Sequence, residues 1–343
     1  MSERVRAEHQ RMSGDELRSV LSHWDLGEVT SIQEVKMGST RAPKVRLECT
    51  EGRFLLKRLA HERADPMRIA FQHRLHRSLQ SAGYPVPELI PITSNAGTLL
   101  ELKGFSYELC RFVDGRRYDG SADDAHSSGS RLAGFHDLAK QHAETAPPGR
   151  GYHNRDDVFK AANQLIRTRP ELDEGQCLLL QGHLERARDA AAVQWLSLPA
   201  TVVHGDWHPG NLLYGAWGVS AVLDLETVRV DPCIAELANA LLHGAMPAGG
   251  AGDAAVIEPI STVPMRAMLK GYCLVARDGL IDSELEALPP LMLEALSVEA
   301  VIALHRKGGF GTWTGPEFID FVCRRADWIN ENADTIRTLA KGD

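Results

Sequence analysis

The stretch from Thr201 to Asp231 reads TVVHGDWHPGNLLYGAWGVSAVLDLETVRVD, and it decides the fold. Three short runs within it are rich in β-branched and apolar residues and are separated by Gly and Pro, which predicts short strands joined by loops. These runs are Thr201–Val203, Leu212–Tyr214 and Val219–Leu225. The polar residues fall in the first loop and at the end of the third run.

Four oxygen-bearing side chains stand at these strand ends. Asp206 and Asn211 follow the first run, while Asp224 and Glu226 close the third, with Leu225 pointing to the opposite face. We expect Asp206, Asn211 and Asp224 to meet at one acidic spot. Such oxygens suit Mg²⁺, which prefers one or two carboxylates together with phosphate oxygens and water. A further carboxylate that orients a hydroxyl completes what phosphoryl transfer from a nucleotide needs from side chains.

The same residues resemble a family signature. The letters HGD at 204–206 with Asn211, followed by DLE at 224–226, are similar to the HGDxxxxN and DxE motifs of the aminoglycoside phosphotransferase and choline kinase-like family. The resemblance implies an α+β, two-lobed protein-kinase-like fold, with a small β-rich N-lobe over residues 1–112 and a larger, mainly helical C-lobe over residues 113–343.

Roles for individual residues follow from the resemblance. It implies that Asp206 is the catalytic carboxylate facing the acceptor hydroxyl, that Asn211 and Asp224 bind Mg²⁺, and that Glu226 is a further metal partner, direct or through water. An alternative takes His204, His208 and Asp224 as zinc ligands. Two His four residues apart bind zinc well on one helical face, but the Gly and Pro between and beside them disfavour a helix. A buried, loop-bracing role suits His204 better.

Upstream, strand-like runs at Val29–Val35, Lys44–Cys49 and Arg53–Leu59 predict an antiparallel sheet. By resemblance, a loop containing Gly38 and Ser39 covers the phosphates of ATP with backbone amides. Lys57 would pair with the α and β phosphates. A solvated strand lysine and a plain hairpin turn are the ordinary alternatives for these two features.

A helix is expected to begin at Asp65-Pro66. Where an acidic partner for Lys57 belongs on that helix, the sequence has Gln72 and His73. Further on, an apolar strand runs into the Gly turn at 115, and by resemblance it is the hinge, where backbone groups from Glu108 to Cys110 bind adenine.

After the hinge, helical patterns follow one another, among them 128–142 and 316–339, while Gly308–Gly311 is expected to form a loop. His136, on the first of these helices, is interpreted as a packing residue.

Composition limits the class of protein. Apolar residues make up 43% and charged residues 24% of 343 residues, as in ordinary globular proteins. The net charge of −8 argues against a nucleic-acid surface, and no run of 18 apolar residues predicts a membrane span. Six Cys without a Cys-x-x-Cys pair, and a polar N-terminus without a signal peptide, favour the cytoplasm.

The predicted reaction is transfer of the ATP γ-phosphate to a hydroxyl of a small molecule, such as an amino alcohol, a sugar, homoserine or an aminoglycoside. Two alternatives remain. A protein Ser/Thr kinase-like enzyme needs an activation segment, and the seven residues from Asp224 to Asp231 leave little room for one. A catalytically silent nucleotide-binding protein is suggested by the missing acidic partner of Lys57.

Overall fold

The computed structural model describes residues 10–35, 42–60, 65–245, 260–276, 279–311 and 313–342. The chain divides into two compact units. The N-terminal unit comprises Met1–Gly115 with Ala221–Glu226, and the C-terminal unit comprises Arg116–Ser220 with Thr227–Asp343. Within Ala221–Glu226, the Val222 amide donates to the Pro85 carbonyl of the same unit at 2.7 Å. The predicted lobes, 1–112 and 113–343, stay a prediction.

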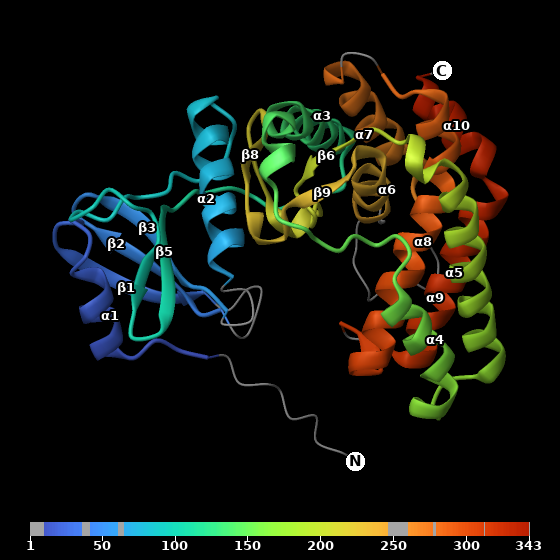
Figure 1. Ribbon diagram of the computed structural model, residues 1–343, viewed down its shortest axis with the longest axis horizontal. Coiled ribbons are helices and arrows are strands. Elements are labelled where there is room, and N and C mark those ends of the chain that lie inside the picture. The colour runs from blue at the N-terminus through green and yellow to red at the C-terminus, as the bar shows by residue number, and fades with distance from the viewer. Residues whose placement is uncertain are drawn as a thin grey trace. The chain divides into compact units, whose positions relative to one another are not determined.

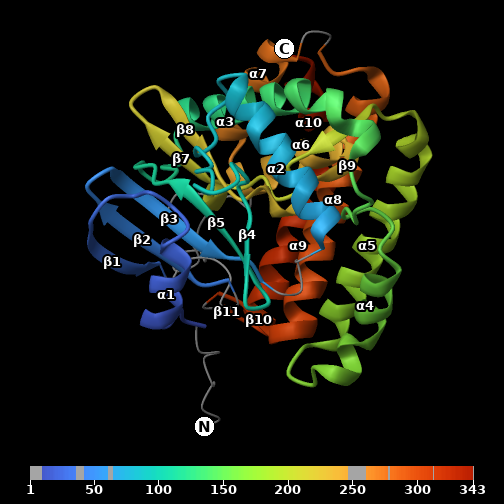
Figure 2. The same cartoon turned by 60° about the vertical axis from the view of Figure 1, so that its left-hand side comes forward.

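The N-terminal unit is built on a five-stranded antiparallel sheet with the strand order β1-β2-β3-β5-β4. The long strands lie side by side in Figure 2. Their bounds are β1 Val29–Val35, β2 Lys44–Cys49, β3 Gly52–Arg58, β4 Leu100–Leu102 and β5 Phe105–Arg111. A two-residue turn joins β2 to β3, and there Gly52 has a φ of 127°, which glycine adopts without strain.

Two helices complete this unit. The letters SGDE at 13–16 are a capping-box pattern, and in α1 (Gly14–Leu21) the Ser13 hydroxyl and the Glu16 carboxylate form it. Glu16 also receives hydrogen bonds from Arg58 and from Tyr107 on the sheet, at 2.9 and 2.8 Å. The second helix, α2 (Pro66–Ser81), begins at the Asp65 cap and buries Phe71, Leu75 and Leu79 together with Gln72 and His73. Apolar periodicity therefore carries two polar residues into the interior of the unit.

The C-terminal unit is mostly helical (Figure 1). Its helices are α3 Ala122–Ala139, α4 Asp156–Thr168, α5 Glu174–Gln194, α6 Cys233–Gly244, α7 Thr262–Val275, α8 Asp282–Lys307, α9 Gly315–Glu331 and α10 Ala333–Lys341. Strand pairs and 3₁₀ turns are short: β6 Ala200–Val203 with β9 Arg229–Pro232, β10 Gly309–Phe310 with β11 Trp313–Thr314, η2 Lys140–Thr145, η3 Trp195–Ser197 and η4 Pro209–Asn211. The strand β8 Gly218–Val222, which pairs with β7 Leu212–Gly215, and the turn η5 Leu225–Thr227 each include residues of the segment Ala221–Glu226.

Helix α8 is the centre of this unit and contacts α4, α5, α6, α9 and α10. It is long and apolar enough to cross a membrane, but 78% of its most apolar 18-residue window is buried within the protein. Burial by its neighbours accounts for the apolar composition, since a core helix is apolar on every face.

The five-stranded sheet and the helical C-terminal part confirm the predicted fold class, with local differences. The third run ends at Val222, because Asp224 has a left-handed φ of 62° and η5 follows it; Asp224 and Glu226 therefore lie in a turn and not on a strand. The first C-terminal helix starts earlier, at the Ser121 cap. The predicted helix 316–339 is divided at Asn332, and the expected loop at 308–311 contributes to the β10-β11 pair.

Candidate active site

In the C-terminal unit, the predicted catalytic residue Asp206 lies in the loop between β6 and η4. The Asn211 side-chain amide donates to the Asp206 carboxylate at 3.0 Å and to its backbone carbonyl at 2.9 Å. On the other side, His208 Nε2 lies 3.5 Å from Asp206 Oδ2. The Asp206 side chain is 41% exposed, so a substrate hydroxyl has access to a carboxylate that is held from two directions.

The charge on Asp206 is set by these neighbours. Burial by itself would raise the pKa of the carboxyl group, but His208, His204 and the Asn211 hydrogen bond lower the pKa to about 2. The carboxylate is ionised at neutral pH, which is the state that accepts a hydrogen bond from a hydroxyl. Of the predicted site residues in the C-terminal unit, the structure brings Asp206 and Asn211 together directly.

His204 has the bracing role that the sequence predicts. Its side chain is fully buried, and Nδ1 accepts a hydrogen bond from the Asp206 amide at 3.3 Å. The next residue, Gly205, has a φ of 85°, and a Cβ there would collide with the Thr227 carbonyl. Both features fix the backbone immediately before Asp206. Among the described residues, no group of three or more His, Cys, Asp and Glu is arranged to hold a metal, as the zinc alternative would require.

A buried carboxylate that the sequence did not single out holds this loop in place. Glu236, in the first turn of α6, accepts the backbone amides of His204 at 3.0 Å and Gly205 at 2.5 Å. His136 Nε2 lies 2.9 Å from the same carboxylate, and its Nδ1 lies 2.9 Å from the Tyr272 hydroxyl. Burial would raise the pKa of Glu236, but the hydrogen bond and charge of His136 lower it. His136 is thus a packing residue, as predicted, that also fixes the loop's anchor.

A second polar group lies near Asp206 and was also missed. The rings of His208 and His243 are 5.8 Å apart, and His243 Nε2 is 3.2 Å from Glu299 Oε1. The Tyr152 hydroxyl donates to the same oxygen at 2.8 Å. Burial would raise the pKa of Glu299, yet His243 and Tyr152 lower it. About a third of the Glu299 side chain is exposed, so this anionic group is accessible near Asp206.

In the N-terminal unit, the predicted nucleotide lysine sits among carboxylates. Lys57 Nζ contacts Glu226 and lies 3.4 Å from Asp224 Oδ1 and 4.0 Å from Glu108 Oε1. Burial by itself would lower the pKa of Lys57, but Asp224, Glu108 and Glu226 raise it. Lys57 is only 7% exposed. It is therefore a buried, permanently charged ammonium and not a solvated strand lysine.

The Lys57 cluster is rich in carboxylates. Asp224, Glu226 and Glu108 surround Lys57, and Lys44, its cross-strand neighbour on β2, brings a second positive charge close to them. Among the described residues no group of three or more such side chains is arranged to hold a metal ion, so the predicted Mg²⁺ contact of Asp224 stays a prediction. Asp224, at its left-handed turn, is 30% exposed and hence the most accessible of the three. Glu226 is paired with Lys57, so its predicted metal contact stays a prediction.

The predicted hinge residues Glu108 and Cys110 lie on β5, where Glu108 is opposite Lys57 and Cys110 is opposite Leu55 in the β3–β5 register. The Leu109 carbonyl accepts from the Ile90 amide, and the Arg111 amide donates to the Glu88 carbonyl, both at 2.8 Å. Burial raises the pKa of the Cys110 thiol to about 12. The adenine contact at 108–110 stays a prediction. Gly38 and Ser39, predicted to bind phosphates, lie outside the described residues.

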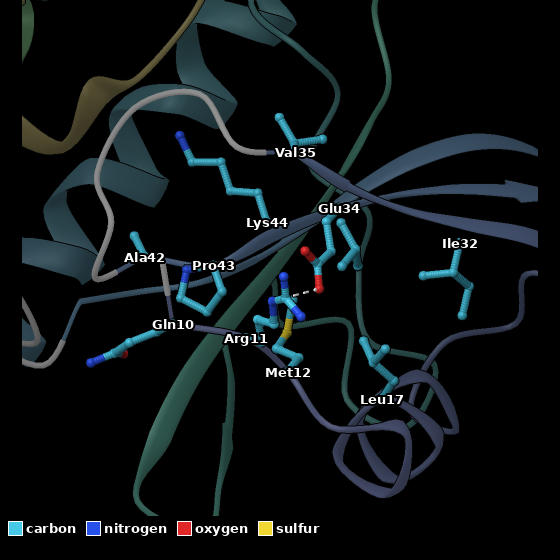
Figure 3. Close-up of a pocket in the computed structure, with 11 residues that line it drawn as sticks. Gln10, Arg11, Met12, Leu17, Ile32, Glu34, Val35, Ala42, Pro43 and Lys44 are labelled. Atoms are coloured by element: carbon cyan, nitrogen blue, oxygen red, sulfur yellow. Dashed lines mark ion pairs between the residues drawn. The ribbon is translucent and has the colours of Figure 1, made fainter. Parts of the chain in front are cut away.

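A cavity of about 210 Å³ lies beside the strands that flank residues 36–41. It is bordered by the segment preceding α1 and by β1 and β2, and the Arg11–Glu34 ion pair crosses it at 3.3 Å (Figure 3). Lys44 also borders it, and Figure 3 shows the Lys44 side chain extending away from Arg11. The cavity adds no group to the Lys57 cluster beyond Lys44.

Comparison with known proteins identifies the class. The structure is similar to an aminopropanol kinase associated with a microcompartment (12% identity, 94% of this chain and 98% of that chain, TM-score 0.68). It is also similar to the amicoumacin kinase hAmiN in complex with AMP-PNP, Ca²⁺ and Ami (15% identity, 94% and 93%, TM-score 0.66). The fold is therefore the α+β protein-kinase-like fold. The phosphotransferase enzyme family matches residues 31–264, and the chain belongs to this family.

Among curated proteins, the serine/threonine protein kinase RdoA of Salmonella typhimurium (strain LT2) is 26% identical over 187 residues. The match covers 54% of this chain and 55% of that protein. The chain thus spans about half the length of the curated relatives it matches. The protein is therefore a member of the phosphotransferase enzyme family.

Proposed function

We propose that this enzyme transfers the γ-phosphate of ATP to a hydroxyl group of a small molecule that also carries an amine. The observation that supports this most is the state of Asp206: ionised, partly exposed and oriented by Asn211 and His208. A carboxylate in this state accepts the hydrogen bond of a hydroxyl and directs its oxygen toward phosphorus. The proton of the hydroxyl then passes to Asp206.

The other residues bind and position the nucleotide. The side-chain nitrogen of Asn211 donates to Asp206, so the side-chain carbonyl oxygen of Asn211 remains available to bind a metal ion. Asp224 offers the most accessible carboxylate of the Lys57 cluster. When bound, Mg²⁺ neutralises charge on the phosphates. Lys57 adds a fixed positive charge for phosphate oxygens, and because positioning and electrostatics dominate phosphoryl transfer, these groups suffice for catalysis.

We place the adenine contact slightly beyond the segment predicted from sequence. The backbone around Leu109 and Arg111 is used by neighbouring segments, and the Phe112 amide donates to the Arg53 carbonyl at 2.9 Å. No backbone hydrogen bond among the described residues uses the Phe112 carbonyl or the Val113 amide, and we propose these two groups as the adenine contact. These backbone groups would form hydrogen bonds with the edge of a purine, and no particular side chain would be needed.

The acceptor is proposed to be an amino alcohol or an amino sugar. Glu299 and Asp206 are both ionised, and the His208–His243 contact connects them. An ammonium group on Glu299 would leave a hydroxyl elsewhere on the same molecule free to reach Asp206. Two of the similar structures are described as an aminopropanol kinase and a spectinomycin phosphotransferase with ADP and its antibiotic, in keeping with a small acceptor.

The test is a screen of amino alcohols and amino sugars with Mg·ATP, followed by Asp206→Asn. This substitution keeps the shape of the side chain and removes the proton acceptor, so kcat is expected to fall about 10²- to 10⁴-fold while ATP affinity is retained. Asp189→Asn, an exposed change on α5, is the matched control. Equal turnover by Asp206→Asn and the wild-type enzyme would refute the assignment.

A protein acceptor is the second candidate, because of the 26% identity to RdoA. Incubation with radiolabelled ATP and a dephosphorylated Ser/Thr-rich protein separates the two. Label in protein without turnover of any small amine would favour this candidate. Nucleotide binding with neither product would favour the catalytically silent alternative.

A further inference from the structure

The lysine that family membership assigns to the phosphates lacks an acidic partner on α2. In the protein-kinase fold, a helix glutamate pairs with this strand lysine and holds it in position. Here α2 presents Gln72 and His73 to the interior, and each is only 6% exposed. Something else must hold Lys57, since a buried ammonium without a carboxylate would lose its charge.

Strand β5 supplies that carboxylate. Lys57 and Glu108 are directly opposite in the β3–β5 register, and cross-strand neighbours project to the same side of a sheet. Lys57 Nζ is 4.0 Å from Glu108 Oε1. The Glu108 side chain is only 13% exposed, so water competes little with Lys57 for its carboxylate.

His73, on α2, holds the Glu108 carboxylate in position. Its Nε2 is 3.1 Å from Glu108 Oε2, and its Nδ1 is 2.7 Å from the Thr98 hydroxyl. A carboxylate only accepts, so His73 donates from Nε2 to Glu108, while its Nδ1 shares a hydrogen bond with the Thr98 hydroxyl. One oxygen of Glu108 therefore faces the lysine while the other is fixed by α2.

Glu108 differs from the other two carboxylates on Lys57. Asp224 and Glu226 belong to the motif that the family uses for metal, and a bound nucleotide and Mg²⁺ would compete for them. Glu108 lies outside that motif and is held by His73. The position of Glu108 beside Lys57 is therefore fixed by the sheet register and by α2, independently of that motif.

We propose that Glu108, held in position by His73, is the residue that positions Lys57 for the nucleotide phosphates, in place of an acidic residue on α2. This inference rests on the proposed function, because it assumes that Lys57 meets a nucleotide. Burial would raise the pKa of Glu108, but His73 and Lys57 lower it to about 2, so the carboxylate remains charged.

The arrangement has a consequence for the helix. Lys57 and its partner are cross-strand neighbours in one sheet, so their pairing is set by β-sheet register. Helix α2 contributes the orientation of the carboxylate and not its charge. Loss of His73 should therefore weaken nucleotide binding less than loss of the Glu108 charge.

The experiment measures affinity for Mg·AMP-PNP by calorimetry and the kinetic constants for ATP. Glu108→Gln is expected to weaken AMP-PNP binding and to lower kcat/KM for ATP by about ten- to a hundredfold, with the acceptor KM unchanged. His73→Ala should have a smaller effect. Glu101→Gln, an exposed Glu on β4 of the same sheet, is the control and should match the wild-type protein.

Moving the carboxylate from β5 to α2 distinguishes a role in positioning Lys57 from a contribution to folding alone. The double variant Glu108→Gln with His73→Glu moves the carboxylate to α2, and it should recover at least half of the lost binding free energy. Thermal unfolding is measured for every variant, because a structural role would change the melting temperature without the rescue of affinity.

The outcomes are distinct. Wild-type affinity in Glu108→Gln, or a double variant no better than Glu108→Gln alone, would overturn the role of Glu108. If the wild-type protein bound no Mg·AMP-PNP at all, the proposed function itself would fail. If it bound nucleotide and the variants behaved as expected while no acceptor turned over, the positioning role would hold independently of the acceptor.

Discussion

The anchoring of the Asp206 loop by Glu236 gives the sharpest prediction in the C-terminal unit. Glu236→Ala removes the acceptor of two backbone amides and the partner of His136, all in the interior. A buried amide left without an acceptor costs about 1–3 kcal/mol, and breaking a buried ion pair costs about 3–5 kcal/mol in total. Since the terms overlap, we expect the free energy of unfolding to fall by about 4 kcal/mol.

Activity should fall as well, because the freed amides immediately precede Asp206. If Asp206 is the catalytic carboxylate that we propose, a displacement of about 1 Å there lowers kcat about 10²-fold, while the KM for ATP should change little. Glu236→Gln keeps one acceptor oxygen and should lie between the wild-type enzyme and Glu236→Ala in both measurements. The assays are urea unfolding at pH 7 and steady-state kinetics well below the melting temperature.

The control for this prediction is a carboxylate of similar burial that serves another part of the unit. Asp124 is 1% exposed and binds the Arg116 guanidinium through two hydrogen bonds, at 2.5 and 2.6 Å. Asp124→Ala should destabilise the protein comparably and leave kcat nearly intact in the folded fraction. A Glu236→Ala protein with a loss below about 1 kcal/mol and an unchanged kcat would refute the anchoring role.

Three further predictions follow from single contacts. Glu299→Gln should raise the KM for an amine-bearing acceptor about tenfold and leave the KM for ATP unchanged, whereas an equal effect on a neutral acceptor would contradict the proposed ammonium contact. The folded-state pKa of Glu108, about 2, lies below its usual 4.5, so its charge contributes about 3 kcal/mol above pH 4.5. This contribution is lost as the pH falls toward 2, and the stability difference between wild-type and Glu108→Gln should therefore narrow in acid urea titrations. Gly129→Ala should cost about 1–3 kcal/mol because the new Cβ would collide with the Met268 carbonyl of α7, while Gly182→Ala on α5 meets only the flexible end of Arg186 and should be neutral or stabilising.

Much of the fold could be predicted from the sequence because its helices and strands depend on local sequence patterns. The capping box before α1, the Pro at the start of α2 and the alternating strands of the sheet each place their signal within a few residues. The errors also have local causes. The strand expected to continue to Leu225 stops at Val222, because Asp224 takes a left-handed conformation that composition does not reveal.

The candidate site was only partly readable. Asp206 and Asn211 are five residues apart, and the motif spacing was enough to predict their contact. Glu236 lies 31 residues beyond Gly205, and Glu299 lies 56 beyond His243. No periodic signal connects such pairs, since each depends on which helices come to lie together.

The sequence by itself determined the chemical groups of this enzyme: a carboxylate, an amide and a lysine at family spacing, set between elements whose periodicity could be read. It also showed that α2 lacks an acid, but it could not show what replaces it. The tertiary structure decided that Glu108, 51 residues from Lys57, fills the role, because antiparallel pairing places the two side by side. Local preferences act over a few residues. The partner of a buried charge depends on which distant segments the folded unit brings together and on the cost of removing the charge from water.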